Sequence, residues 1–392
     1  MRKRVCVITG SRAEYGLLYP LLKELSEDKK YFELRIIVTG MHISPEFGLT
    51  YKEIEKDGFK INERVDISLI SDTSAGISRS TGLAVAGFAK AYDKLRPDIV
   101  IGLGDRFEFF GAVTAALISR IPVAHISGGE ITEGVFDNSL RHAITKMSHV
   151  HFTALEEYRK RVIQMGESPE TVFTVGALAL DNIKNLKLLS RKELERQLGI
   201  KFDTHNLLVT FHPVTLEDNS AREQFWDLLK ALDGLKETKI IFTKANADID
   251  GSVINKMIDE YVRKNFNKAC VFASMGRFCY LSAMQYVDAM VGNSSSGIIE
   301  APSFKIGTIN IGDRQKGRVR TESVIDCLPK VQDIKRAFMI CYSHRFRKRL
   351  QGMANPYGDG KTAGKIKNIL KKIDLTNILK KSFYNIKFNA KR

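Results

Sequence analysis

The chain has 392 residues and a formal net charge of +16, and hydrophobic residues make up 44% of it. This length predicts two domains, and the composition is that of an ordinary soluble globular protein. No apolar run approaches the roughly 20 residues that span a bilayer. The first apolar run, Val5 to Ile8, is too short for a signal peptide. We therefore expect a cytoplasmic protein without membrane insertion.

Short apolar runs alternate with longer amphipathic segments in the first part of the chain. The runs in this part lie at 4–10, 34–40, 98–104 and 121–128. The same pattern returns at 207–213, 239–246, 288–294 and 307–313. Near-continuous Val and Ile runs separated by helices indicate a parallel sheet that is covered on both faces. The sequence therefore predicts an α/β protein with two doubly wound, Rossmann-like domains and a cleft between them.

The stretch between the two sets of strands contains helix formers and no core strand. It covers residues 176–199, and we expect the domain boundary near Asp181 to Leu189. We assign 1–182 to an N-terminal domain, 183–360 to a C-terminal domain and 361–392 to a basic helix and tail. This last segment has ten Lys or Arg against one Asp. A solvated helix face is the favoured interpretation of it, and contact with nucleic acid or with a membrane surface is the alternative.

The cysteines and two nearby histidines have plain structural interpretations. Cys6, Cys270, Cys279, Cys327 and Cys341 show no CxxC spacing, so we expect reduced thiols. The spacing of His149 and His151 in "SHVHF" could suit a metal. No third ligand stands out in the sequence, so a buried strand is favoured and no metal is expected.

Polar residues gather where the predicted strands end. In doubly wound sheets, ligands bind beyond the carboxyl ends of the strands. Those of the first domain are Arg12, Glu14, His42, Asp105, Arg106, Glu108 and the stretch 125–130. Those of the second domain are His212, Asn246, the run Ser294–Ser296 and the loop 312–318. Any one of them could be an N-cap or a structural histidine, but their number favours a polar cleft with a function.

The stretch "VGNSSSGIIEAPS", residues 291–303, leads from a strand into a predicted helix with Glu300 about two turns along it. The serines could simply cap this helix. Alternatively, they could hold an anion with the help of the helix dipole and free backbone N–H groups. Glu300 would then be placed to bind a sugar hydroxyl.

An ordered set of motifs carries a family resemblance. The set is "TGSRAEYG", "TGMH", "GLGDRFE", "HISGGE", "DNSLRHAITKMSHVHF", "FHP", "GNSSSGIIEAPS", "GDRQKGR" and "NPYGDG". It resembles the hydrolysing UDP-N-acetylglucosamine 2-epimerases of sialic-acid and legionaminic-acid biosynthesis, from the N-terminus to about residue 370. The resemblance implies the glycosyltransferase-B fold and a closing helix that crosses back to the first domain.

The resemblance also implies roles for residues of this chain. The residues implied for substrate binding are Arg12, Arg106, Asn246, Ser294, Ser295, Ser296, Glu300, Arg314 and Arg318. In that set the serines would hold the diphosphate, Glu300 the ribose, Asn246 the nucleotide and the arginines the anion. The residues implied for catalysis are Asp105, Glu130, Asp137 and His212. The three acids would share the proton transfers, and His212 would assist the leaving phosphate.

The implied reaction converts UDP-N-acetylglucosamine and water into N-acetylmannosamine and UDP through a 2-acetamidoglucal. The alternative substrate is UDP-N,N′-diacetylbacillosamine, which gives 2,4-diacetamido-2,4,6-trideoxymannose for legionaminic acid. Neither needs a cofactor, and we expect a homodimer or homotetramer that binds a UDP-sugar and no nucleic acid. A non-hydrolysing epimerase, a glycosyltransferase and a non-enzymatic binder remain less favoured alternatives.

Two positions depart from the family pattern. Ser127 stands where non-hydrolysing relatives have a Glu, and the acid follows as Glu130. Asn138 stands where many hydrolysing members have a second acid after Asp137, which puts a catalytic role for position 138 in doubt. The stretch "TGMHISPEFG" lacks the Gln-His-Arg-Glu of non-hydrolysing bacterial enzymes and so favours the hydrolysing branch.

Overall fold

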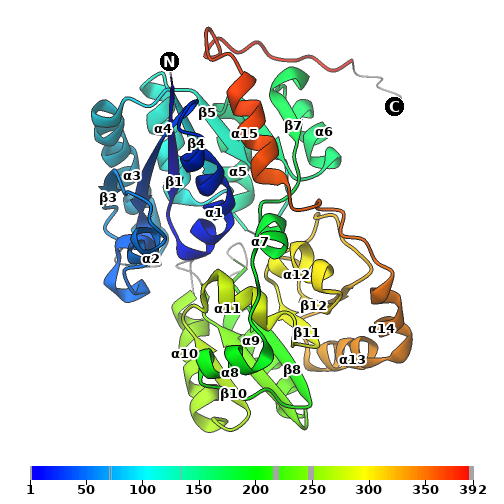
Figure 1. The fold of residues 1–392 in the computed structure, drawn as a ribbon. Coiled ribbons are helices and arrows are strands. Elements are labelled where there is room, and N and C mark those ends of the chain that lie inside the picture. The colour runs from blue at the N-terminus through cyan, green and yellow to red at the C-terminus, as the bar shows by residue number, and fades with distance from the viewer. Residues whose placement is uncertain are drawn as a thin grey trace.

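The computed structural model describes residues 2–69, 71, 73–133, 135–214, 220–245 and 251–387. Two all-parallel sheets form the two halves of the molecule (Figure 1). Their strand orders are β3-β2-β1-β4-β5-β6-β7 and β10-β9-β8-β11-β12-β13. The predicted fold class, two doubly wound α/β domains, is confirmed. Within the described ranges, no helix is long and apolar enough to cross a bilayer.

The strands of the first sheet are β1 (Lys3–Thr9), β2 (Phe32–Thr39), β3 (Glu63–Val65), β4 (Ile99–Leu103), β5 (Val123–Ile126), β6 (Val150–Thr153) and β7 (Val172–Thr174). Those of the second sheet are β8 (His205–Thr210), β9 (Thr238–Thr243), β10 (Ala269–Phe272), β11 (Ala289–Gly292), β12 (Gly307–Ile311) and β13 (Val324–Cys327). Every expected apolar run contains a strand. The short edge strands β3, β7, β10 and β13 were not predicted, because they are partly exposed and lack a continuous apolar run.

The helices that follow the first-sheet strands are α1 (Arg12–Glu27), α2 (Tyr51–Lys56), α3 (Ser74–Leu95), α4 (Phe107–Ile118), α5 (Asp137–Met147), α6 (Glu156–Gln164) and α7 (Ala179–Asn185). The remaining helices are α8 (Arg191–Leu198), α9 (Ser220–Asp233), α10 (Gly251–Lys264), α11 (Gly276–Ala283), α12 (Ser296–Ile299), α13 (Val331–Tyr342), α14 (His344–Gln351) and α15 (Thr362–Lys372). Single 3₁₀ turns lie at Gly40–Ile43, Pro45–Phe47, Pro169–Thr171 and Ala301–Phe304.

The central strand β1 shows why the sheet is buried on both faces. Val5 and Val7 pack with α1 and α15, whereas Cys6 and Ile8 pack with α3 and α4 on the opposite face. Because side chains alternate between the faces of a strand, a run without polar residues needs a helical layer on each side. The Val and Ile runs therefore determine the three-layer architecture.

The C-terminal helix α15 belongs to the core of the first domain. Its residues Ala363, Ile366 and Leu370 are buried among the side chains of α1 and β1. Figure 1 shows α15 beside α1 and away from α13 and α14 of the second domain. The carboxylate of Asp181 in α7 accepts hydrogen bonds from the backbone N–H groups of Thr362 and Ala363, at 2.9 and 2.7 Å. This carboxylate caps α15 where the chain returns to the first domain.

Both sheets reverse their strand order at one point. In the first sheet the reversal lies between β1 and β4, and in the second between β8 and β11. Loops that leave neighbouring strands on opposite sides of such a point leave a crevice at the carboxyl edge, where ligands bind. Arg12 follows β1 and Asp105 follows β4, while His212 follows β8 and Ser294 follows β11. The topology thus places predicted site residues at both reversals.

Replacing Ile366 by Ala tests whether α15 stabilises the first domain. Ile366 is fully buried, so the substitution removes apolar contacts and should lower the free energy of unfolding by about 2–5 kcal/mol. Urea denaturation followed by circular dichroism measures this change. Lys372→Ala, at the exposed end of the same helix, should change it by less than about 0.5 kcal/mol. Equal effects of the two substitutions would contradict this role for α15.

Candidate functional site

Arg141 connects three parts of the first domain at the carboxyl edge of its sheet. It lies on α5 and is only 2% exposed. Its Nη1 donates to the backbone oxygen of Glu130 at 2.9 Å and to Oγ1 of Thr132 at 3.1 Å. Its Nη2 forms an ion pair with the carboxylate of Asp105. A single buried guanidinium therefore fixes the loop after β4 against the loop after β5.

Glu130 forms an ion pair across the two domains. Its Oε2 lies 2.8 Å from Nη2 of Arg318, in the loop after β12 of the second sheet. Both side chains are at most 7% exposed. Nε and Nη1 of Arg318 have no hydrogen-bond partner among the described residues. A buried guanidinium with unused donors is placed to receive an anion.

Two tyrosines hold the Arg318 loop against the first domain. The hydroxyl of Tyr158 on α6 accepts from the backbone N–H of Val319 at 3.1 Å. The hydroxyl of Tyr357 donates to the backbone oxygen of Val319 at 2.8 Å and lies 3.0 Å from the Tyr158 hydroxyl. Both rings are fully buried. The position of Arg318 is therefore fixed by contacts that span the chain from residue 158 to residue 357.

The charges around Arg141 leave a surplus of positive charge. Burial lowers the pKa of Arg141 well below its usual range, and the neighbouring cations Arg318 and Arg314 lower it further. The carboxylates paired here are those of Asp105 and Glu130. Three guanidinium groups close to two carboxylates favour an anionic ligand.

The other predicted arginines of the first domain have carboxylate partners of their own. Arg12 pairs with Glu53 at 3.0 Å, and Nε of Arg106 donates to Oε1 of Glu108 at 2.6 Å. Close by, Glu14 accepts from the backbone N–H of Gly10 at 2.6 Å. Burial raises the pKa of Glu14 to about 8, so its carboxyl group is largely protonated at neutral pH. Glu53 and Glu108 therefore hold Arg12 and Arg106 near the ends of their strands.

The serine loop after β11 differs from its prediction in one respect. The expected two-turn helix is the single turn α12, and Glu300 lies at its end and not inside a longer helix. Pro302 explains this difference, because a proline has no backbone N–H with which to continue the α-helical hydrogen bonds, and the chain goes on as the 3₁₀ turn Ala301–Phe304. A helix dipole therefore contributes little here, and any anion at this loop would depend on hydroxyl and backbone N–H groups.

Glu300 is buried and accepts a hydrogen bond from the hydroxyl of Ser296 one turn earlier. Burial raises the pKa of Glu300 to about 7, although this hydrogen bond works against the shift. The hydroxyl of Tyr280 interacts with the hydroxyls of Ser294 and Ser296. The loop is therefore a partly buried cluster of hydroxyl groups around one buried acid that titrates near neutral pH.

Asn293 was not predicted and fixes the geometry of the second half of the site. Its side-chain oxygen accepts from the backbone N–H of His212, and its side-chain nitrogen donates to the backbone oxygen of His212, both at 2.7 Å. The backbone oxygen of Asn293 accepts from Arg314 at 3.2 Å and from Gln315 at 2.8 Å. Three loops of the second domain therefore meet at Asn293. Asn293 lies between the end of β11 and the serine run, and this position in the sequence could have indicated that it belongs to the site.

The structure brings together most of the predicted residues. Asp105 and Glu130 meet at Arg141, and His212 and Arg314 meet at Asn293. Asp137 is the first residue of α5, while Ser295 is the N-cap residue of α12. The predicted Asn246 lies outside the described residues.

Three residues outside the site have structural contacts. Asn138 accepts from the backbone N–H of Thr132 at 3.1 Å, so it fixes the loop that carries Glu130. His151 pairs with Glu167 at 3.0 Å, and His149 accepts from the backbone N–H of Val123 at 3.2 Å. In the part of the chain that the structure describes, no three or more His, Cys, Asp or Glu residues are grouped as a metal would need.

The fold and sequence are similar to those of known proteins. A crystal structure titled as a putative UDP-N-acetylglucosamine 2-epimerase from Listeria monocytogenes superposes with a TM-score of 0.79 at 18% identity, covering 95% of this chain and 96% of that one. A Campylobacter jejuni protein named GDP/UDP-N,N′-diacetylbacillosamine 2-epimerase (hydrolyzing) is 45% identical, over 98% of this chain and all of its own length. The polysialic acid biosynthesis protein P7 of Escherichia coli is 40% identical, over 91% of this chain and 90% of its own.

A family model places the chain among these proteins. Residues 23–371 match the model described as UDP-N-acetylglucosamine 2-epimerase. This match covers most of both domains and includes Asp105, Glu130, Arg141, His212 and Ser294. The chain belongs to the UDP-N-acetylglucosamine 2-epimerase family.

Proposed function

We propose that this protein is a hydrolysing 2-epimerase of a UDP-linked, N-acetylated amino sugar. The observation that carries the proposal is the buried cluster between the domains. There Asp105 and Glu130 are paired with Arg141 and Arg318, and Arg318 has two N–H groups without a hydrogen-bond partner among the described residues. Such a site offers carboxyl groups for proton transfer beside a cationic place for a diphosphate.

The reaction needs a base, a stabilised leaving group and a water molecule. The C2 proton moves to a carboxylate, the C1–O bond breaks with its electron pair on UDP, and a C1=C2 double bond forms. Water then adds at C1, where its oxygen forms the new bond and one of its protons passes to a carboxylate, while a protonated acid returns a proton to the opposite face of C2. Asp105 and Glu130 lie in the guanidinium cluster where the leaving diphosphate would bind, so we assign the first proton acceptance to them. We assign the other proton transfers to Asp137 and His212.

The second domain would bind the UDP moiety. The hydroxyls of Ser294 and Ser295 would donate to the diphosphate, as would that of Ser296 once it releases Glu300, with Arg314 and Arg318 balancing its charge. The carboxylate of Glu300 would accept hydrogen bonds from the ribose hydroxyls. Arg12 and Arg106 would approach the same anion from the first domain, and we keep Asn246 as a proposed nucleotide contact. The negative charge that develops on the leaving group would thus meet fixed positive charge.

We favour UDP-N,N′-diacetylbacillosamine over UDP-N-acetylglucosamine as the substrate. The Campylobacter jejuni relative that is 45% identical is named for the bacillosamine derivative. The Escherichia coli relative at 40% identity is named for polysialic acid biosynthesis. The two sugars differ at C4 and C6, where a site built for one would leave polar groups unpaired with the other. All five cysteines are free thiols, which suits the reducing cytoplasm in which we propose that the protein acts.

A proton NMR time course in D₂O tests the reaction and the substrate together. UDP-N,N′-diacetylbacillosamine, its GDP analogue and UDP-N-acetylglucosamine are offered separately at equal concentration. We expect free UDP and a mannose-configured sugar that carries deuterium at C2, with at least tenfold higher kcat/KM for the UDP-bacillosamine derivative. An epimer that remains linked to UDP would contradict the hydrolytic reaction. A preference for UDP-N-acetylglucosamine would reverse the substrate assignment.

Asp105→Asn and Glu130→Gln should separate catalysis from binding. Each amide keeps the size of the acid but cannot accept the proton, so kcat should fall at least a hundredfold, a typical loss for a missing acid or base. The Kd for UDP, measured by titration calorimetry, should change by less than threefold. Glu133→Gln, an exposed acid in the same loop, is the matched control and should retain activity. A large loss of UDP affinity would show that Asp105 and Glu130 act in binding.

Binding of UDP should depend on pH through Glu300. Its pKa of about 7 in the free protein means that ribose hydroxyls, which donate to the ionised form, must displace a proton below that pH. We expect UDP affinity to fall about tenfold from pH 8 to pH 6, with proton release detected in buffers of different ionisation enthalpy. Glu300→Gln should bind UDP more weakly and lose this part of the pH dependence, leaving only the titration of UDP itself. An identical pH profile in wild type and variant would exclude Glu300 from the site.

A further inference from the structure

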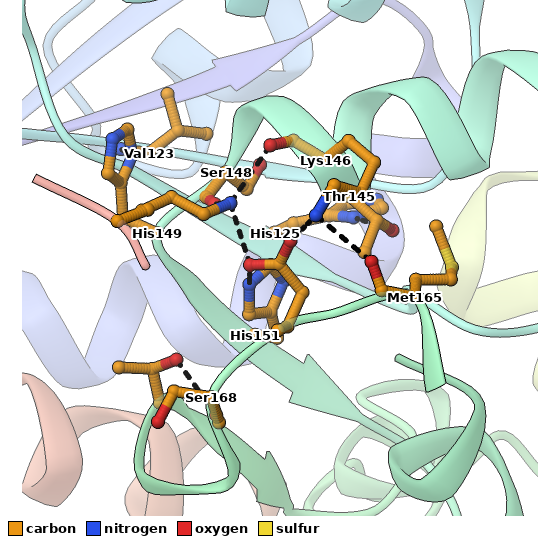
Figure 2. A network of polar contacts seen from close by, with 12 residues as sticks. Val123, His125, Thr145, Lys146, Ser148, His149, His151, Met165 and Ser168 are labelled. Carbon is orange, nitrogen blue, oxygen red and sulfur yellow. Dashed lines mark hydrogen bonds and ion pairs between the residues drawn. The ribbon is translucent and has the colours of Figure 1, made fainter. Parts of the chain in front are cut away.

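Glu167 is a buried acid that the proposed reaction does not use. It follows α6 and is 1% exposed. Its Oε1 lies 2.6 Å from Nζ of Lys146, and its Oε2 lies 3.0 Å from Nε2 of His151 and 2.6 Å from Nζ of Lys381. These contacts are part of the network in Figure 2, in which Lys146 and His151 are labelled. One buried carboxylate therefore holds side chains from α5, β6 and the C-terminal segment.

Lys381 is supplied by the segment that follows α15. Its Nζ also donates to the backbone oxygen of Lys146 at 2.9 Å and to that of Ser148 at 2.5 Å. Two residues later the ring of Phe383 lies against Gly166, where an added Cβ would come within 2.3 Å of the ring. The backbone N–H of Tyr384 donates to the oxygen of Gly166 at 2.9 Å. The segment itself is exposed, so the Lys381 ammonium is its inward anchor.

The pairing of His151 with Glu167 leads to the loop of Asp105. His151 lies opposite His125 in the register of β6 and β5, and both rings are fully buried. Nε2 of His125 lies 2.7 Å from the backbone oxygen of Gly104. A carbonyl only accepts, so this nitrogen carries the proton, and burial keeps the ring neutral by lowering its pKa to about 3. Gly104 precedes Asp105 directly, so His125 holds the peptide that carries the proposed base.

We propose that Lys381 is a positioning residue for catalysis. By pairing with Glu167 it keeps His151 and His125 in place, and these residues hold the Gly104–Asp105 peptide at the carboxyl end of β4. The inference rests on the proposed catalytic role of Asp105. It assigns the C-terminal segment to the catalytic machinery of the first domain, although that segment is more than 270 residues away from Asp105 in the chain.

The charges explain why the lysine matters. Without Lys381, the carboxylate of Glu167 keeps only Lys146 as a lysine partner among the described residues. It then stabilises the protonated form of His151 more strongly. Burial keeps the pKa of His151 low, and the positive charges of Lys381 and Lys146 reinforce this effect against the carboxylate. Loss of Lys381 therefore favours a charged His151 next to His125 and loosens the hydrogen bond to Gly104. A neutral amide at position 167 would remove the negative charge that favours protonation of His151.

Lys381→Met removes the ammonium and keeps the length of the side chain. We expect kcat to fall five- to twentyfold at a temperature well below the melting point, with KM and UDP affinity within threefold of wild type. Lys381→Arg should restore most of the activity, because it keeps the charge and the donors. Lys380→Met is the matched control, since Lys380 is exposed in the same segment, and it should be unaffected. The double variant Glu167→Gln with Lys381→Met should recover at least half of the loss.

Hydrogen exchange gives a readout that needs no substrate. The backbone N–H of Gly104 donates to Ile126 at 3.0 Å, so its exchange rate reports on the order of the Asp105 loop. We expect at least tenfold faster exchange in Lys381→Met and wild-type rates in Lys380→Met. A lower melting temperature with unchanged kcat and exchange would overturn the proposal and make the segment merely stabilising. A loss of kcat without faster exchange would overturn it too. Failure of the wild type to turn over any UDP-sugar refutes the proposed function instead.

Discussion

The structure depends on one interaction, the pairing of buried acids with buried arginines where the two domains meet. Arg141, Asp105 and Glu130 belong to the first domain, while Arg318 belongs to the second. Removing one member would leave a buried charge without compensation, which costs about 3–5 kcal/mol. The pairing of Glu130 with Arg318 exists only when the domains are in contact. Domain packing and the assembly of the proposed site are therefore the same event.

The parallel topology determines which loops can take part in this pairing. Loops at the carboxyl edges of the two sheets meet through Glu130 and Arg318, and each sheet reverses its order once, at β1/β4 and at β8/β11. The loops at these reversals have no neighbouring crossover to cover them, so their polar side chains stay available. Arg141 and Asn293 then link neighbouring loops within each domain. A UDP-sugar fits this arrangement because its diphosphate and its sugar can lie on different domains.

The sequence predicted the features that depend on short-range patterns. Continuous Val and Ile runs indicate buried parallel strands, and strand-end polar residues indicate the site, so the fold and the place of Asp105 and His212 could be derived. The ion pair of Glu130 with Arg318 joins residues far apart in the chain, and no local pattern predicts it. The predicted two-turn length of α12 was wrong, because Pro302 lacks the backbone N–H that a longer helix needs. The roles of Asn293 and Tyr280 need neighbours that only the folded chain provides.

In the basic C-terminal segment, net charge alone does not indicate which ligand the lysines bind. Ten Lys or Arg against one Asp after residue 360 is a composition that often indicates nucleic-acid binding. In the folded chain, however, Lys367 pairs with Glu24, Lys371 with Asp28 and Lys381 with Glu167, all of them acids of the first domain. A lysine committed to an internal carboxylate must break that pair before it can bind a phosphate. These three lysines of the C-terminal segment therefore neutralise acids of the first domain, and a free polyanion has to compete with those acids.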